Sequence, residues 1–260
     1  MAIPVALTIA GSDPSGGAGI QADLKTFHQL GVYGEAAITL ITVQNTCGVQ
    51  SIECLSGHLV AAQIQAVLDD IPPAAAKTGA LGSREIIENV AAMAARFSFP
   101  LIVDPVLFST NGKPLLAAGA LEAFQADLLP HAFLLTPNLD EAAVLTGLPV
   151  CDLRSMRAAA EKLGTLGPRA VLVKGGHLTG NATDVLFYKG EFLEFPALRI
   201  ETRHTHGTGC TFSAAITALL AAGNDLETSV RKAKQYITEA IRSSPGLGRG
   251  AGPVNHHADV

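Results

Sequence analysis

Hydrophobic residues along this chain follow two alternating patterns. Short apolar runs of strand length are separated by longer stretches in which apolar residues recur every three or four positions, as on one face of a helix. In one such stretch the apolar face holds Ile20, Leu24 and Phe27, and Gly31 then ends the predicted helix. The predicted strands cover 5–11, 36–45, 99–106, 132–138 and 169–176, and the predicted helices cover 19–31, 58–71, 84–97 and 155–167.

This alternation predicts an α/β fold. Continuous apolar strands separated by amphipathic helices are typical of a parallel sheet with helices on both faces. Residues 182–197 differ, because two strand-like runs flank a turn at 189–190 and indicate a β-hairpin. A short strand at 74–80 and a last helix at 226–242 complete the prediction. We find no linker-like composition and no internal repeat, and therefore expect one domain over 1–260.

Composition excludes several classes of protein. The formal net charge of −5 and the lack of a dense basic cluster argue against non-specific nucleic-acid binding. No apolar run reaches the roughly 18 residues that span a membrane. The N-terminal apolar run has no Lys or Arg before it, so we interpret it as a buried strand and expect a cytoplasmic protein. The four cysteines form no Cys-x-x-Cys pair and are expected to stay reduced.

A glycine-rich loop, GSDPSGGAGIQAD, follows the first predicted strand. It is not a P-loop, because no Lys-Ser or Lys-Thr follows its glycines. Its GAGIQA portion fits a dinucleotide fingerprint, but the second strand ends in Gln44 and Asn45 where that motif needs an acidic residue for the ribose. Two interpretations remain: a loop that shapes a small-substrate pocket, or a turn that only allows close strand–helix packing.

Polar residues occur at the carboxyl ends of the predicted strands, the edge at which open parallel sheets bind ligands. Some have a purely structural alternative, since Asn138 can cap the next helix and Asp104 can form a turn before Pro105. Together they offer lysines for phosphate and oxygens for a divalent cation, which predicts a site for phosphate with Mg²⁺. The set comprises Ser12, Asp13, Gln44, Asn45, Lys77, Asp104, Asn138, Glu141 and Lys174.

The stretch HGTGC, 206–210, directly precedes an apolar segment of helical period. Its glycines therefore lie at a helix N-terminus, where unpaired N–H groups can bind an anion. Cys210 falls in the first turn, a position that lowers the pKa of a thiol, so we expect a thiolate that can accept a proton from a substrate hydroxyl. A small buried core cysteine and a redox thiol are the alternatives. A metal site with His204 and His206 lacks a second ligand pair.

Eight segments carry a family resemblance when taken in order. The chain resembles the hydroxymethylpyrimidine/phosphomethylpyrimidine kinases of thiamine biosynthesis, in the ribokinase-like superfamily, over nearly its whole length. The resemblance implies one ribokinase-like domain that uses ATP and Mg²⁺ to phosphorylate 4-amino-5-hydroxymethyl-2-methylpyrimidine, and then the monophosphate to the diphosphate. It also implies a homodimer. The segments are AGSDPSGGAGIQADLKTF, VQNTCGVQ, KTGALGS, VDPV, TPNLDEA, LVKGGH, HGTGCTFSAA and GPVNH.

The resemblance implies roles for residues of the phosphate site. Cys210 takes the place of the aspartate base of the superfamily's sugar kinases, next to an anion hole formed with Gly207, Thr208 and Gly209. Lys174 reaches the ATP phosphates. The ATP-phosphate set is Lys174, Asn138, Thr208 and Gly209, and the metal set is Asp104 and Glu141.

The acceptor end carries its own implied set: Gln44, Asp23, Gly11, Val106 and Ala80. A Gln amide or a carboxylate can pair with the amino group and ring nitrogen of a 4-aminopyrimidine. Ala80 departs from the family, which usually has Met there, and this implies a roomier pocket. A pyridoxal-type vitamin kinase on the same fold is the alternative function, against which Gln44 argues modestly. A catalytically silent binding protein is more distant, because Lys174, Asp104 and Glu141 are present.

Overall fold

One continuous β-sheet organises the chain. The computed structural model describes residues 3–109 and 112–259. The strands are β1 (Val5–Ser12), β2 (Tyr33–Asn45), β3 (Gly48–Cys54), β4 (Ala75–Thr78), β5 (Leu101–Val103), β6 (Leu134–Leu135), β7 (Ala170–Val173), β8 (Asp184–Tyr188) and β9 (Glu191–Phe195).

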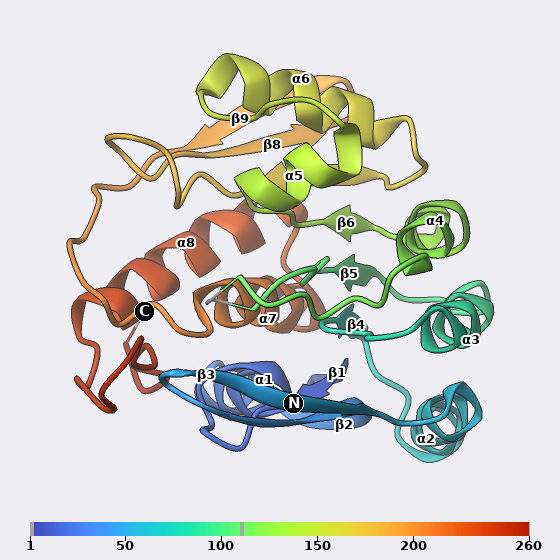
Figure 1. Ribbon diagram of the computed structural model, residues 1–260. Coiled ribbons are helices and arrows are strands. Elements are labelled where there is room, and N and C mark those ends of the chain that lie inside the picture. Colours follow the sequence, from blue (N-terminus) through green and yellow to red (C-terminus); the bar gives the residue numbers. More distant parts are fainter. Residues whose placement is uncertain (1–2, 110–111, 260) are drawn as a thin grey trace.

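The strand order is β3-β2-β1-β4-β5-β6-β7-β8-β9 (Figure 1). The strands from β2 to β7 in this order pair in parallel. Antiparallel strands close both edges, with β3 beside β2 and the β8–β9 hairpin beside β7. The predicted α/β class with a mostly parallel sheet and a hairpin is therefore confirmed.

Helices cover both faces of this sheet, as predicted from the continuous apolar strands. Among the described residues, no helix is long and apolar enough to cross a membrane. The helices are α1 (Gly19–Gln29), α2 (Gly57–Asp70), α3 (Arg84–Ala94), α4 (Ala120–Ala123) with a π-turn (Phe124–Leu128) and a 3₁₀ turn (Leu129–His131), α5 (Leu139–Thr146), α6 (Leu153–Gly164), α7 (Thr208–Ala221) and α8 (Leu226–Arg242).

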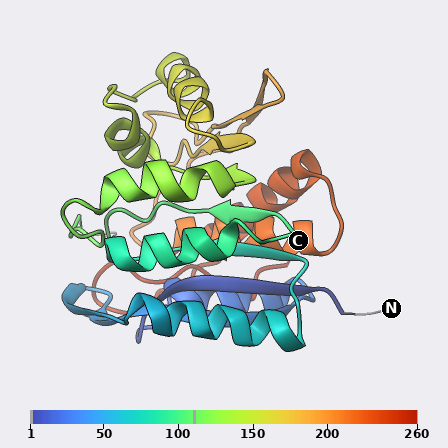
Figure 2. The ribbon, with the colours of Figure 1, turned by 90° about the vertical axis from the view of Figure 1, so that its right-hand side faces the viewer.

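Different helices form the layers on the two faces of the sheet. α2, α3, α5 and α6 lie on one face and α1, α7 and α8 on the other, and Figure 2 views the molecule from the side of α2 and α3. Helix α7 is buried almost all round, because it packs against the sheet and against both α1 and α8. This explains its alanine-rich apolar sequence, since a helix without a solvent-facing side needs no polar stripe.

Two elements were not predicted. Strand β3 returns antiparallel to β2, although the prediction ended that region at Asn45. Its sequence GVQSIEC is largely polar and its side chains are half-buried or exposed, because it lies at the sheet edge and contributes little to the core. The short helical run 120–131 was also missed. In addition, β5 and β6 are much shorter than predicted.

Candidate active site

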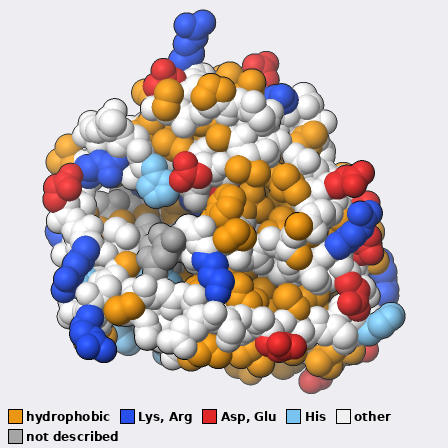
Figure 3. All heavy atoms as spheres, in the orientation of Figure 1, with side chains coloured by type: hydrophobic (Ala, Val, Ile, Leu, Met, Phe, Trp, Pro, Cys, Tyr) orange, Lys and Arg blue, Asp and Glu red, His pale blue; other side chains and the backbone are white. Residues whose placement is uncertain are grey.

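A cavity of about 720 Å³ lies at the carboxyl ends of the parallel strands. Figure 3 shows the mouth of this cavity as a hollow on the left of the view, beside a histidine and an acidic side chain. The predicted site positions were spread over the chain, and the cavity wall gathers all of them but Asp23 and Lys77. Gathered in the wall are Gly11, Ser12, Asp13, Gln44, Asn45, Ala80, Asp104, Val106, Asn138, Glu141, Lys174, Gly207, Thr208, Gly209 and Cys210.

The predicted anion hole begins at Gly207, where any side chain would force the backbone to shift. Gly207 precedes helix α7 with φ of 78°, a left-handed conformation that favours glycine. A Cβ atom at Gly207 would lie 1.7 Å from the carbonyl oxygen of Gly17. The loop therefore rests directly on the glycine-rich loop after β1, and the first turn of α7 lines the cavity. Amides in a first turn have no intrahelical partner, so they can bind a phosphoryl group.

Cys210 lies in that first turn as a half-buried free thiol. Burial raises the pKa of the Cys210 thiol to about 12, although the Lys77 ammonium and the Gly19 amide favour the thiolate. The prediction of a lowered pKa is therefore wrong for the ligand-free protein. The helix N-terminus acts over only one turn, whereas the loss of water around the sulfur disfavours its charge more strongly.

Asp23 lies outside the cavity wall. Its carboxylate is completely buried, where Lys77 Nζ is 2.7 Å away and Thr8 Oγ1 donates at 2.6 Å. Burial alone would lower the pKa of Lys77, but Asp23 holds it above its usual value. Asp23 is thus not part of the cavity wall, and its role in pyrimidine binding stays a prediction. Its partner is a lysine buried beside it, a pairing that no sequence spacing indicated.

The phosphate side is organised by a second buried ion pair. Lys174 Nζ lies 2.8 Å from Asp104 Oδ1, and Ser213 donates to the other carboxylate oxygen at 3.1 Å. Burial alone would raise the pKa of Asp104, but Lys174 and Lys77 hold it below its usual value. A Cβ built on Gly209 would be 3.3 Å from Lys174 Nζ, so this ammonium lies at the anion hole. Asp104 is thus buried and lines the cavity wall.

Asn138 and Glu141 form a reciprocal capping box at the start of α5. Asn138 Oδ1 accepts from the Glu141 N–H at 2.9 Å, and Glu141 Oε2 accepts from the Asn138 N–H at 2.9 Å. Helix capping by Asn138, the structural alternative, is confirmed, while both residues also line the cavity. Burial raises the pKa of Glu141 despite the nearby Lys174. A carboxyl in this state gains from a cation placed beside it.

Asp104 and Glu141 supply part of the ligand set that Mg²⁺ needs. Within the described residues no three His, Cys, Asp or Glu side chains gather as a ready-made metal cage. Asp104 and Glu141 lie close enough to interact electrostatically, and both face the cavity. Mg²⁺ commonly binds through one or two carboxylates, substrate phosphates and water. These two residues suit an ion that arrives with a phosphorylated ligand.

The acceptor end is shaped by backbone as much as by side chains. Val106 has φ of 42°, which is rare and strained for a β-branched residue. The next residue, Leu107, uses its N–H to donate to Glu141 Oε1 at 3.3 Å. Thr39 Oγ1 donates to the Ala80 carbonyl at 2.6 Å and fixes that segment. Gln44 lies in the same wall.

The opposite end of the cavity was not predicted. Lys234 Nζ binds Asp184 Oδ2 at 2.7 Å, and apolar side chains line the same cavity. These residues come from α7, α8, β8 and the segment after β9, so no local motif marks them. The apolar members include Leu198, Ile200, Phe212, Ile237 and Ile241.

Comparison with known proteins shows the family of the chain. The family model described as phosphomethylpyrimidine kinase matches residues 13–255. The chain belongs to this family. It is 49% identical over 253 residues to a hydroxymethylpyrimidine/phosphomethylpyrimidine kinase of Streptomyces coelicolor, across 97% of this chain and 94% of that protein.

Two solved structures of related kinases share the fold of this chain. Phosphomethylpyrimidine kinase from Clostridium difficile superposes with a TM-score of 0.82 at 44% identity, over 92% of this chain and 99% of that one. Pyridoxal kinase from Bacillus subtilis, in an ADP complex, gives 0.91 at 38% identity, over 99% and 98%. The ribokinase-like fold is therefore confirmed, and a phosphomethylpyrimidine kinase and a pyridoxal kinase share it.

Proposed function

We propose that this chain uses ATP to phosphorylate 4-amino-5-hydroxymethyl-2-methylpyrimidine and then its monophosphate, as the names of its relatives describe. The observation that carries the proposal is that one cavity is lined by Gln44, by Lys174 and by Gly207–Cys210. Gln44 can donate to and accept from the edge of an aminopyrimidine. The glycine amides and Lys174 can neutralise a transferring phosphoryl group.

The nucleotide fits the other half of the same cavity. Apolar side chains on the wall that α8 contributes, among them Ile237 and Ile241, offer a slot for the adenine ring. The phosphates then extend towards Lys174 and the first turn of α7. Mg²⁺, which Asp104 and Glu141 would hold with the phosphates, supplies positive charge that offsets the charge of the phosphoryl group.

Cys210 is proposed to take the proton of the hydroxymethyl group. Burial raises the pKa of the Cys210 thiol, so this thiol must first release its own proton to water before the sulfur can accept one from the hydroxymethyl group. Lys77 and the Gly19 amide are the groups that favour the thiolate needed for this step. The second phosphorylation needs no such base, because its acceptor is already an ionised phosphate.

The substrate assignment is tested by rates with competing acceptors. We would measure kcat/KM with ATP and Mg²⁺ for the pyrimidine, its monophosphate and pyridoxal, for the wild type, Gln44→Leu and Ala80→Met. The proposal expects the pyrimidine to be preferred by the wild type and its kcat/KM to fall in Gln44→Leu. Preference for pyridoxal would contradict it.

A pyridoxal-type kinase is the second candidate. The observation that favours it is the TM-score of 0.91 to a pyridoxal kinase, together with the small Ala80 side chain in the acceptor wall. In that case Gln44→Leu should leave pyridoxal turnover unchanged.

We also propose a cytoplasmic homodimer. Strand β2 exposes Ile41 and Val43, 48% and 53% accessible, next to the edge strand β3. An exposed apolar pair at a sheet edge suits burial against a second copy. Light scattering after gel filtration should give twice the 26.8 kDa chain mass, and Ile41→Lys should shift it to one chain mass.

A further inference from the structure

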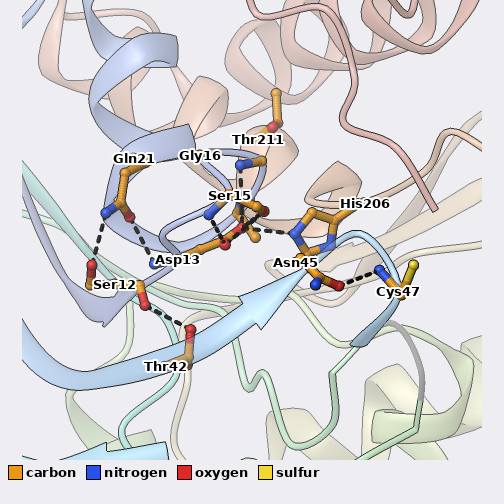
Figure 4. Close-up of polar contacts among 12 residues, drawn as sticks. Ser12, Asp13, Ser15, Gly16, Gln21, Thr42, Asn45, Cys47, His206 and Thr211 are labelled. Carbon is orange, nitrogen blue, oxygen red and sulfur yellow. Dashed lines mark hydrogen bonds and ion pairs between the residues drawn. The ribbon is translucent and has the colours of Figure 1, made fainter. Parts of the chain in front are cut away.

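A hydrogen-bonded link joins the acceptor end of the cavity to the anion hole. Its centre is Asp13, whose side chain is almost fully buried in the loop after β1. His206 Nε2 lies 2.8 Å from Asp13 Oδ2, although the two residues are 193 positions apart. Figure 4 shows the His206 ring directed at this carboxylate.

On the acceptor side, Asp13 is tied to β2. Thr42 Oγ1 donates to the Ser12 carbonyl, directly before Asp13, at 3.0 Å, and the Gln44 side chain is among the groups that lower the pKa of Asp13. The Asp13 N–H donates to Gln21 Oε1 at 2.9 Å, which fixes the loop to α1 (Figure 4). Burial alone would raise the pKa of Asp13, but hydrogen bonds from His206, Gln44 and Ser15 hold it well below its usual value. Asp13 therefore remains a charged acceptor at neutral pH.

On the phosphate side, the same carboxylate holds the loop on which the anion hole rests. Asp13 Oδ2 accepts from the N–H groups of Gly17 at 3.2 Å and Ala18 at 2.9 Å. The Gly17 carbonyl fills the space where a Cβ of Gly207 would be. His206 is the residue directly before Gly207, so its contact with Asp13 sets the entry of the chain into α7.

We propose that Asp13 and His206 are positioning residues that couple the two substrates. An acceptor that binds Gln44 engages a side chain that also acts on Asp13, and Asp13 holds His206 and the Gly207 turn, so acceptor binding further stabilises the arrangement of the anion hole. The inference rests on the proposed function for the identity of the acceptor. Such coupling favours nucleotide binding and phosphoryl transfer when the acceptor is present.

Calorimetry tests the coupling directly. We would measure the affinity for AMP-PCP with Mg²⁺ in the absence and presence of saturating pyrimidine, or of pyridoxal if the wild type phosphorylates only pyridoxal. The wild type should bind AMP-PCP roughly five-fold or more tightly with the acceptor present. In His206→Ala this ratio should fall towards one, whereas His206→Gln, which keeps a donor of similar reach, should retain it.

Ser15→Ala is the matched control. Ser15 Oγ donates to Asp13 at 2.7 Å but makes no link to the Gly207 turn, so its ratio should equal that of the wild type. Thermal melting without ligands shows whether each variant folds. A wild type with a ratio of one, or His206→Ala with the wild-type ratio, would overturn the proposal. Turnover of pyridoxal alone contradicts the proposed function but leaves the coupling ratio measurable.

Discussion

Lys77 Nζ lies 2.7 Å from Asp23 Oδ2, and both side chains are shielded completely from solvent. The two charges act in opposite directions on Cys210, since Lys77 lowers the pKa of the thiol and Asp23 raises it. Lys174 and Asp104 form the other buried pair in electrostatic contact with this thiol. The reactivity of Cys210 therefore reports on the pair directly.

Removing the charges one at a time separates their effects. Asp23→Asn should speed alkylation of Cys210 by iodoacetamide at pH 9, because one negative neighbour is lost. Adding Lys77→Met should slow it again by about tenfold, the change expected for roughly one unit in the thiol pKa. Peptide-resolved mass spectrometry gives the rate at each cysteine, and the exposed Cys151 is the internal control. The same rate in both variants would argue against an electrostatic role for Lys77.

The base role of Cys210 predicts a difference between the two reactions. Cys210→Ala should lower the single-turnover rate for the hydroxymethyl acceptor by about 10²–10⁴-fold, the usual contribution of a positioned base. The rate for the monophosphate acceptor should fall far less, because its phosphate is already ionised. Equal losses with both acceptors would show that Cys210 acts only through the shape of the anion hole.

Two glycines at opposite ends of α7 form a matched pair for testing the anion hole. Gly207 and Gly223 both have positive φ, at 78° and 86°, but a Cβ meets the Gly17 carbonyl at Gly207 and nothing within 4 Å at Gly223. Gly223→Ala should cost about 1 kcal/mol of stability and leave kcat unchanged. Gly207→Ala should abolish most of kcat with both acceptors. Similar kcat values in the two variants would contradict the assignment of the hole.

Much of the fold was predictable because it depends on local patterns. Continuous apolar strands required cover on both faces, and the turn at 189–190 marked a hairpin that β8 and β9 confirm. Strand β3 escaped because an edge strand needs little apolar character. The apolar end of the cavity escaped because its residues come together only through the tertiary fold.

The site shows where sequence reasoning ends. Position in a motif placed Cys210 correctly in a first helical turn, but its pKa depends on burial by distant elements. Asp23 ends the glycine-rich segment in the sequence, yet on α1 its carboxylate is fully buried and pairs with Lys77. Whether a charged side chain faces a ligand or a buried partner is decided by packing, which spacing alone does not report.

Glu35 gives a prediction about stability away from the site. Its Oε2 atom is buried without a hydrogen-bond partner, and burial, with nearby Asp70, raises its pKa to about 7. In the unfolded chain this carboxyl ionises near pH 4.3, so stability is lost as pH rises from about 4 to 7. Glu35→Gln removes this loss, and its melting temperature relative to wild type should rise between pH 5 and pH 8. A pH-independent difference would contradict the raised pKa.

The most direct test of the central claim is a mass-resolved time course with the pyrimidine, Mg²⁺ and excess ATP in one reaction. The account predicts that the monophosphate forms first and is then converted to the diphosphate by the same protein. A pyrimidine left unphosphorylated while ATP and pyridoxal are consumed would contradict it.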